Sequence, residues 1–377
     1  MMPGFKDLKV TWLLPVKNGM PYLREALASI ENQTFRDWEV LAWDNGSTDE
    51  TVDELHRWIP SRLPGRVITD EPLPLGDSLA RMVELSETEF CARIDADDIN
   101  FPERLERQIS FLRDHDEIAM VGSQAIYIND AGTVFARSQL PLDFVEIVAS
   151  LPWTNRILHP SVVFRRSAVL RVGNYRKIGP PGINIEDYDL WFRLAVTNEF
   201  CNLDLPLLYY RFHDKSTTHI ATVAGRLRAP SNQCFLEHAD DLYGLSRREA
   251  IRLLRISRFN MVYAIYKITR IMARKQNRPF LPLFRSRSLT TMGRDYAGLP
   301  DVFSRFSLAL LDGRRSVFRE EMRRVAVEVL KLCGLSPVAS AVRDILRPSE
   351  RRGKAEEGAR GQLQSPATAG LEPDDRL

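Results

Sequence analysis

The chain has 377 residues, 44% hydrophobic and 27% charged, which is more than one small core usually needs. Its 18 Phe, 10 Tyr and 6 Trp supply enough apolar surface to exclude wholesale disorder, a collagen-like repeat and a small disulfide scaffold. Residues 1–225 hold 23 Lys and Arg against 33 Asp and Glu, whereas residues 226–377 hold 29 against 17. An acidic first part suits bound cations, and a basic second part suits a lipid surface, a nucleic acid or another protein.

The cysteines and apolar runs indicate a protein of a reducing compartment. The four cysteines lie far apart without a C-x-x-C pair, so neither a zinc site nor a disulfide framework is indicated. The apolar run at 10–16 is too short for a signal-peptide core, and no apolar stretch approaches the roughly 20 residues that span a bilayer. We therefore expect a cytoplasmic protein.

Short β-rich runs alternate with helical patterns over the first 225 residues, which is typical of an α/β domain around a mostly parallel sheet. Beyond this point the strand pattern ends, and residues 231–345 are expected to be helical. We divide the chain into an α/β domain at 1–225, a basic helical region at 226–348 and a disordered tail at 349–377. In chain order, strands are predicted at 10–15, 38–44, 66–69, 89–95, within 121–137, at 160–166 and 205–213, and helices at 21–33, 52–59, 76–87, 101–115, 144–151 and 186–196.

Three aspartates follow a predicted buried strand in the segment CARIDADDINFPERL, namely Asp95, Asp97 and Asp98. Crowded carboxylates repel one another unless a cation or solvent relieves the repulsion, and Mg²⁺ or Mn²⁺ bridging to diphosphate oxygens is the chemistry that suits them. A solvated acidic loop is the commoner origin of such a cluster. Ligands collect at the carboxyl ends of the strands in open α/β sheets, where Pro15 and Asp44 also lie, and this position favours the metal site.

Seven blocks occur in order over about residues 8–215: LLPVKNG, WDNGSTDET, GDSLAR, RIDADD, HPSVVFRR, EDYDLWFRL and YYRFH. Each is weak alone, and WDNGSTDET by itself is an ordinary turn and helix cap. The ordered set resembles the family 2 glycosyltransferases, which are inverting, nucleotide-sugar-dependent enzymes with a GT-A fold. The resemblance implies metal-dependent transfer of a sugar from a nucleotide-diphosphate sugar to an acceptor hydroxyl, in cell-surface polysaccharide or glycolipid assembly.

The resemblance also implies roles for individual residues. Asp97 corresponds to the direct metal ligand, Asp95 to a ribose or diphosphate contact made partly through the metal, and Asp187 to the general base. The remaining implied residues are Pro15, Val16 and Asn18 at the border of the nucleotide, Asp44 on the base or ribose, Arg81 and Arg93 against the diphosphate, His213 near the metal, and Asp98, Glu186, His159 and Trp191 on the acceptor side.

Physical chemistry supports some of these roles and leaves alternatives open. Inversion requires an acceptor-side carboxylate that takes the hydroxyl proton, yet Asp187 could equally be a helix N-terminal carboxylate stabilised by the macrodipole. A neutral imidazole is an acceptable Mn²⁺ ligand, although a lone histidine such as His213 is more often a hydrogen-bonding residue. Arg81 and Arg93 could instead pack along the surface of a helix or strand.

The sequence departs from common family patterns in two places. Asn45 follows Asp44 where a second acidic residue is frequent, so any contact made at this position loses its charge. The Q-x-x-R-W motif of processive synthases is absent. A single-addition transferase is therefore favoured over a polymerising synthase.

The segment from Arg247 to Arg287 contains twelve Lys and Arg and one acidic residue, Glu249. Its interleaved apolar residues either pack on the α/β domain, as most amphipathic helices do, or lie in an anionic membrane interface. The family resemblance favours the membrane, because many such enzymes act on lipid-linked sugars at the cytoplasmic membrane face. Nucleic acid is not expected as a partner, since no recognition module accompanies the charge.

Two other functional classes compete with the transferase. A nucleotidyltransferase would use similar carboxylates but would normally need a glycine-rich phosphate loop with a lysine, and PVKNG lacks the glycines. A non-catalytic nucleotide-sugar-binding adaptor with a basic membrane- or partner-binding C-terminal region would lose nothing measurable on Asp187→Asn, whereas a transferase would lose turnover.

Overall fold

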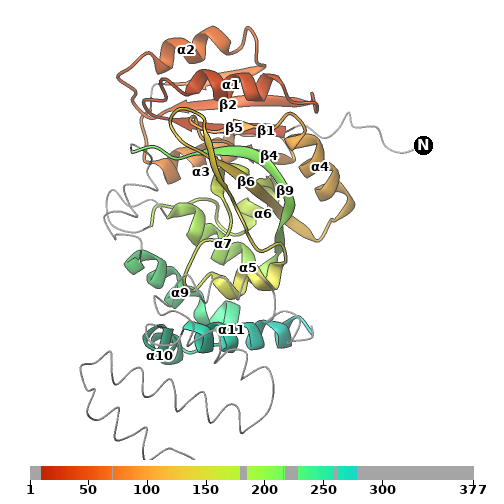
Figure 1. Cartoon of the computed structure of the whole chain (residues 1–377), viewed down its shortest axis with the longest axis vertical. Coiled ribbons are helices and arrows are strands. Elements are labelled where there is room, and N and C mark those ends of the chain that lie inside the picture. The colour runs from red at the N-terminus through yellow and green to blue at the C-terminus, as the bar shows by residue number, and fades with distance from the viewer. Residues whose placement is uncertain are drawn as a thin grey trace, which may run out of the picture. The chain divides into compact units, whose positions relative to one another are not determined.

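A mixed sheet of nine strands forms the centre of the part of the chain that this computed structural model describes, which is residues 10–69, 71–178, 185–214, 216, 228–257 and 261–277. The strand order is β3-β2-β1-β4-β8-β6-β9-β5, and β7 pairs with β6 (Figure 1). The strands are β1 (Val10–Val16), β2 (Trp38–Asp44), β3 (Gly65–Ile68), β4 (Phe90–Arg93), β5 (Ile99–Asn100), β6 (Ile118–Ile128), β7 (Val134–Arg137), β8 (Val163–Arg165) and β9 (Glu199–Arg211).

Helices cover both faces of the sheet. The helices are α1 (Leu23–Glu31), α2 (Thr51–Trp58), α3 (Leu75–Leu85), α4 (Arg104–Asp114), α5 (Phe144–Ser150), α6 (Arg166–Arg171), α7 (Glu186–Thr197), α9 (Arg228–Tyr243), α10 (Arg247–Ser257) and α11 (Met261–Lys275), with a 3₁₀ turn η2 (His159–Ser161). Successive residues of a strand point to opposite faces, so Trp12 and Leu14 join the apolar cluster that contains Leu27 of α1, while Leu13 belongs to the face on which α3 packs. The predicted α/β architecture is confirmed.

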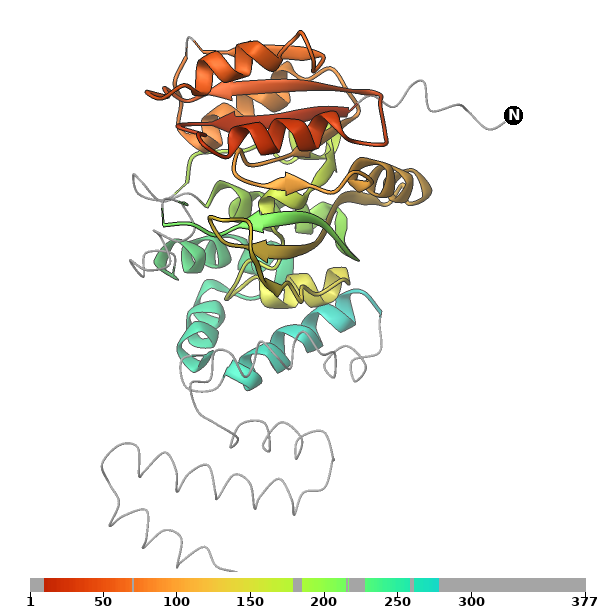
Figure 2. The same ribbon diagram turned by 45° about the horizontal axis from the view of Figure 1, so that its top comes forward.

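Parallel pairing brings the carboxyl ends of the first strands level with one another. β1 pairs in parallel with β2 and β4, and Val16 at the end of β1 lies opposite Asp44 at the end of β2. Figure 2 shows β1 and β2 side by side with α1 along them. The loops that follow Val16, Asp44 and Arg93 therefore leave the sheet at one edge.

Several boundaries differ from those expected. β4 ends at Arg93, so Asp95 lies in the loop beyond it rather than at the end of the strand. The expected strand at 160–166 begins with the 3₁₀ turn η2, because the N–H of Ser161 bonds back to the carbonyl of Leu158. β9 begins at Glu199, well before residue 205, because its first half pairs with the buried strand β6.

The described C-terminal helices pack on the α/β part through α5 and α7. α9 contacts α7, α11 contacts α5, and the hydroxyl of Tyr243 donates a 2.8 Å hydrogen bond to the carbonyl of Val148. Ala264 and Ile268 of α11 are buried. Packing thus accounts for these apolar residues, while 278–348 and the expected tail at 349–377 lie outside the described residues. Among the described residues, no helix has both the length and the apolar character needed to cross a membrane.

Candidate active site

A cavity of about 820 Å³ opens where the loops leave the sheet. Its walls come from the end of β1 with the loop before α1, from the segment before α3, from the loop after β4 and from the residues after β9. The predicted residues that line it are Pro15, Val16, Asn18, Asp95, Asp97 and His213. Segments from opposite ends of the α/β domain therefore combine into one site.

Asp44 supports this cavity from behind and is not one of its lining residues. Its side chain is 2% exposed, and Oδ2 accepts hydrogen bonds from the N–H groups of Gly46 (3.0 Å) and Ser47 (2.9 Å). Oδ1 is buried without a hydrogen-bond partner. Asn45, which follows Asp44, does line the cavity. Asp44 thus fixes the loop that begins at Asn45, and Asn45 is the residue of the pair that lines the cavity.

Asn18 ties the first loop to the second. Its side-chain carbonyl accepts a 2.8 Å hydrogen bond from the N–H of Thr48, and its own N–H donates to Oγ of Ser47 at 2.8 Å. Asn18 has a positive φ of 53°, a conformation that asparagine tolerates better than most residues. Asn18, which is predicted to border the nucleotide, therefore also fixes the conformation of the two loops that it joins.

The three aspartates of the D-x-D segment converge. One carboxylate oxygen of each of Asp95, Asp97 and Asp98 lies within 4.8 Å of the others. Asp98 is 1% exposed, its Oδ1 accepts a 2.9 Å hydrogen bond from the N–H of Arg211, and its Oδ2 is buried with no hydrogen-bond partner. Burial, together with the charges of Asp97 and Asp95, raises the pKa of Asp98 well above its ordinary value.

His213 completes this cluster from the other side of the cavity. Its Nε2 lies 2.8 Å from Oδ2 of Asp97, and this hydrogen bond raises the pKa of His213. Hard carboxylate oxygens with one imidazole are ligands that Mn²⁺ accepts, and the orphaned buried Oδ2 of Asp98 is a negative atom that a cation would compensate. The donor set thus fits a divalent cation.

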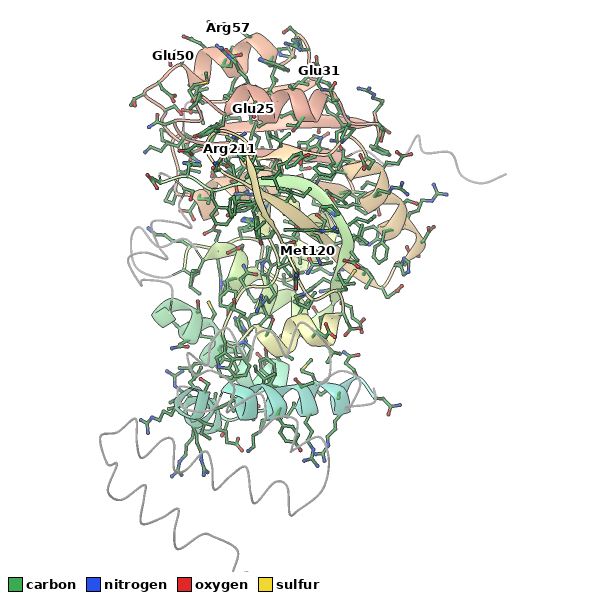
Figure 3. All side chains as sticks on the ribbon, in the orientation of Figure 1. Glu25, Glu31, Glu50, Arg57, Met120 and Arg211 are labelled. Atoms are coloured by element: carbon green, nitrogen blue, oxygen red, sulfur yellow. The ribbon has the colours of Figure 1, made fainter. Side chains whose placement is uncertain are left out.

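Arg211 holds the cluster together, and the sequence analysis assigned it no role. It is 2% exposed, and its guanidinium donates to the carbonyl of Asp97 (3.0 Å), the carbonyl of Asp130 (3.1 Å) and Oε2 of Glu25 (2.6 Å). Arg211 and Glu25 are labelled in Figure 3. The sequence signal was an arginine at the end of an apolar strand.

The two arginines expected at the diphosphate have other places. Arg93 is 2% exposed and forms an ion pair with Asp95 beneath the cavity. Arg81 is half exposed on α3, donates a 2.8 Å hydrogen bond to Glu84, and is not among the cavity-lining residues. The structure does not bring Arg81 into the cavity, because its guanidinium pairs with Glu84 along the helix surface, so its role at the diphosphate stays a prediction.

A second pair of carboxylates begins α7. Asp187 accepts hydrogen bonds from Nδ2 of Asn155 (2.8 Å) and from the N–H of Tyr188 (2.7 Å), and burial raises its pKa to about 6. Burial and then the charge of Asp187 raise the pKa of the neighbouring Glu186 to about 8. Stabilisation by the macrodipole alone would lower these pKa values, so desolvation dominates here.

The two carboxylate sets are electrostatically connected. The charge of Asp95 contributes to the raised pKa of Glu186, and the charge of Arg93 acts on Asp187 in the opposite direction. One buried guanidinium therefore lies within electrostatic reach of both sets.

The other residues expected on the acceptor side are mostly structural. Trp191 has no exposed surface, and its ring packs edge-on against His159 at 5.9 Å between centroids. Nε2 of His159 lies 2.9 Å from the hydroxyl of Tyr175, and burial lowers the pKa of His159 well below its ordinary value. Trp191 is therefore corrected to a core residue, because α7 is buried on nearly all sides and packs most extensively against α9. Asp98 is likewise buried against Arg211.

Comparisons with known proteins identify the family of the chain. The family described as "Glycosyl transferase family 2" matches residues 11–173. The O-antigen biosynthesis glycosyltransferase WbnJ of Escherichia coli is 32% identical over 202 residues, which are 52% of this chain and 76% of WbnJ. The amylovoran biosynthesis glycosyltransferase AmsE of Erwinia amylovora is 30% identical over 46% of this chain and 63% of AmsE.

Among solved structures, the mannosyltransferase PcManGT from Pyrobaculum calidifontis, in complex with GDP-Man and Mn²⁺, is 18% identical, with 85% of this chain and 86% of that chain covered at a TM-score of 0.47. On the strength of the family match and the identity to WbnJ over most of that protein, this chain is an enzyme of glycosyltransferase family 2.

Proposed function

We propose that the enzyme moves a sugar from a nucleotide-diphosphate sugar to an acceptor hydroxyl with inversion, in the assembly of a cell-surface polysaccharide or glycolipid. The observation that carries the proposal is the presence of two separate carboxylate sets. One is the D-x-D cluster at the cavity, and the other is Glu186 with Asp187 at the start of α7. WbnJ and AmsE are named for O-antigen and amylovoran biosynthesis, which supports the process.

The cavity suits the donor. Its volume of about 820 Å³ lies within the range of roughly 300–1,000 Å³ that small-molecule sites occupy. Asp95, Asp97 and His213 would hold Mn²⁺ or Mg²⁺, which when bound supplies positive charge against the leaving diphosphate. Asn18 and Asn45 line the cavity from two adjoining loops and would border the nucleotide.

Asp187 serves as the base. In its ionised form it takes the proton of the acceptor hydroxyl as that oxygen bonds to the anomeric carbon, while the bond from this carbon to the diphosphate oxygen breaks. Asn155 and the N–H of Tyr188 hold the carboxylate in place. A base with a pKa of about 6 is ionised at neutral pH yet retains more affinity for a proton than an exposed aspartate.

Nucleoside diphosphate release tests this assignment. Wild type and Asp187→Asn are incubated with a panel of UDP- and GDP-sugars, Mn²⁺ and a mixture of glycan acceptors, and donor binding is measured in parallel. The variant is expected to lose 10²-fold or more of the release, consistent with loss of a general base, while it binds the donor as wild type does. Asp116→Asn, at a side chain that is 96% exposed, is the matched control. Unchanged release by Asp187→Asn would contradict Asp187 as the base, and no release by wild type with any donor would favour the adaptor.

We further propose that α10 and α11 contact an anionic membrane. Eight of their basic side chains, namely Arg247, Arg248, Arg252, Arg255, Lys267, Arg270, Arg274 and Lys275, are exposed. Since the described apolar residues of these helices are largely occupied by packing, the contact would be electrostatic rather than inserted.

A further inference from the structure

Four aromatic rings gather at the end of β6, β7 and β9, on residues Tyr127, Phe135, Tyr210 and Phe212. Tyr127 lies directly opposite Tyr210 in the parallel register of β6 and β9, so their side chains share one face. The ring of Tyr127 is 6.0 Å from that of Tyr210, 5.2 Å from Phe212 and 6.2 Å from Phe135, and Phe135 is 5.6 Å from Phe212. These four residues are called the aromatic face below.

The aromatic face is open to solvent. Phe135 is 58% exposed, the residues of β7 are all exposed, and the other three rings are half-buried. Val134, the other large apolar residue of β7, lies opposite Ile128 in the register and therefore belongs to the other face of the hairpin. Phe135 contacts the rings of Tyr127 and Phe212, and an exposed aromatic cluster that carries phenol hydroxyls is a suitable binding surface.

The aromatic face adjoins the cavity, and it lies within electrostatic reach of the segment whose Asn155 holds Asp187. Phe212 directly precedes His213, and Asp130 in the turn between β6 and β7 lines the cavity. On the other side, burial raises the pKa of Tyr127 and the charge of Arg156 opposes this rise, so the guanidinium of Arg156 lies within electrostatic reach of the phenol. Arg156 follows Asn155, whose amide holds Asp187.

We propose that the aromatic face is the acceptor subsite, on which a sugar ring of a glycan acceptor stacks with its C–H face against Phe135 and Tyr127. This rests on the proposed function and names its acceptor class. Sugar rings combine an apolar C–H face with a hydroxyl rim, which matches two phenol hydroxyls and a neighbouring guanidinium around one exposed phenylalanine. A membrane-inserting surface would instead need several exposed apolar side chains on one face, and here Phe135 alone is mostly exposed.

Binding of simple glycosides tests the subsite directly. Saturation-transfer NMR is recorded for the methyl α- and β-glycosides of glucose, galactose, mannose and N-acetylglucosamine, with the full chain in Mn²⁺ and UDP or GDP. Wild type is expected to transfer saturation to the protons of one ring face of at least one glycoside. Phe135→Ala is expected to weaken that affinity roughly three- to tenfold, as the loss of one aromatic contact would.

Matched variants separate stacking from a general disturbance. Val134→Ala, on the other face of the same strand and 56% exposed, should bind like wild type, and Phe135→Trp should retain binding. Equal binding by Phe135→Ala, or no saturation transfer to any glycoside by wild type, would overturn the proposal. So would a Phe135→Ala defect that is seen only in binding to vesicles of phosphatidylcholine and phosphatidylglycerol.

Calorimetry of UDP and GDP on the same samples reports separately on the donor site, so failure of the acceptor subsite and failure of the proposed function are distinguished.

Discussion

Individual buried charges organise the candidate site. Arg93 pairs with Asp95, and Arg211 joins the backbone around Asp97 and Asp98 to Glu25 of α1. Neither guanidinium is exposed by more than 2%, so each fixes carboxylates without competing water. The result is a set of acidic groups with unequal proton affinities, which is the condition for giving them different tasks.

The pH dependence of turnover should show the raised pKa of Asp187. Because Asp187 must be ionised to accept a proton, activity is absent well below its pKa and rises as pH increases through about 6. Single-turnover sugar transfer, measured from pH 5 to 8 at saturating donor and Mn²⁺, would report the pKa. A rate that does not change between pH 5 and 7.5 would contradict the role of Asp187.

At the scale of elements, α7 carries the base and is held by a buried ion cluster. Asp189, two residues after Asp187, has no exposed surface and accepts hydrogen bonds from Nε of Arg176 (2.8 Å) and Nε of Arg193 (2.8 Å). Burial opposes its ionisation, but Nε2 of His238 at 3.7 Å, the hydrogen bonds from Arg176 and the charge of Arg193 outweigh burial and hold the pKa of Asp189 well below its ordinary value.

Removing this anchor should destabilise the protein. Asp189→Asn leaves buried cations without their anion, which typically costs about 3–5 kcal/mol, an upper figure here because Arg176 is 44% exposed. Urea unfolding at pH 7 measures the loss, with Asp116→Asn as the control. Because the folded pKa is depressed, the contribution is complete above about pH 5 and is lost as pH falls below the unfolded value of about 4. Equal stability of Asp189→Asn and wild type at pH 7 would contradict the anchor.

The basic helices α10 and α11 yield a prediction at the same scale. Arg248→Glu with Arg252→Glu reverses two exposed charges of α10, and should reduce binding to anionic vesicles by about tenfold or more at low salt, given roughly 1 kcal/mol per basic residue near a membrane. Arg36→Glu with Arg107→Glu makes the same charge change elsewhere and should have little effect. Vesicle sedimentation at 50 and 500 mM salt measures both, and equal behaviour of the two variants would contradict membrane contact.

For the whole molecule, the sequence was sufficient to predict those features whose residues lie close together in the chain. The D-x-D aspartates, the α/β sheet and the ordered family blocks follow from neighbouring residues, so all could be predicted. Arg211 could not, because it reaches Asp97 across 114 residues of sequence and the β5–β9 pairing, in which Ile99 lies opposite Tyr209, brings them together. Asn155 was missed for the same reason, since it meets Asp187 through the fold.

Trp191 shows that a residue close to the site in sequence need not direct its side chain toward it. Its position one helical turn after Asp187 in EDYDLW suggested a place on the acceptor side, and residues at this spacing do share a helix face, but Trp191 is fully buried and packs against His159. Arg81 likewise lies on a helix near the cavity with its charge paired to Glu84. Closeness in sequence was therefore enough to locate the site. The direction of each side chain depended on packing in the folded protein.

The most direct measurement is calorimetric titration of the full chain with UDP and with GDP, each with and without Mn²⁺, repeated on Asp97→Ala and on the control Asp116→Ala. The account predicts binding of at least one nucleotide that requires Mn²⁺, is lost in Asp97→Ala and is retained in Asp116→Ala. Binding that is indifferent to Mn²⁺ and to Asp97, or no binding under any condition, would contradict a metal-dependent donor site at the D-x-D cluster.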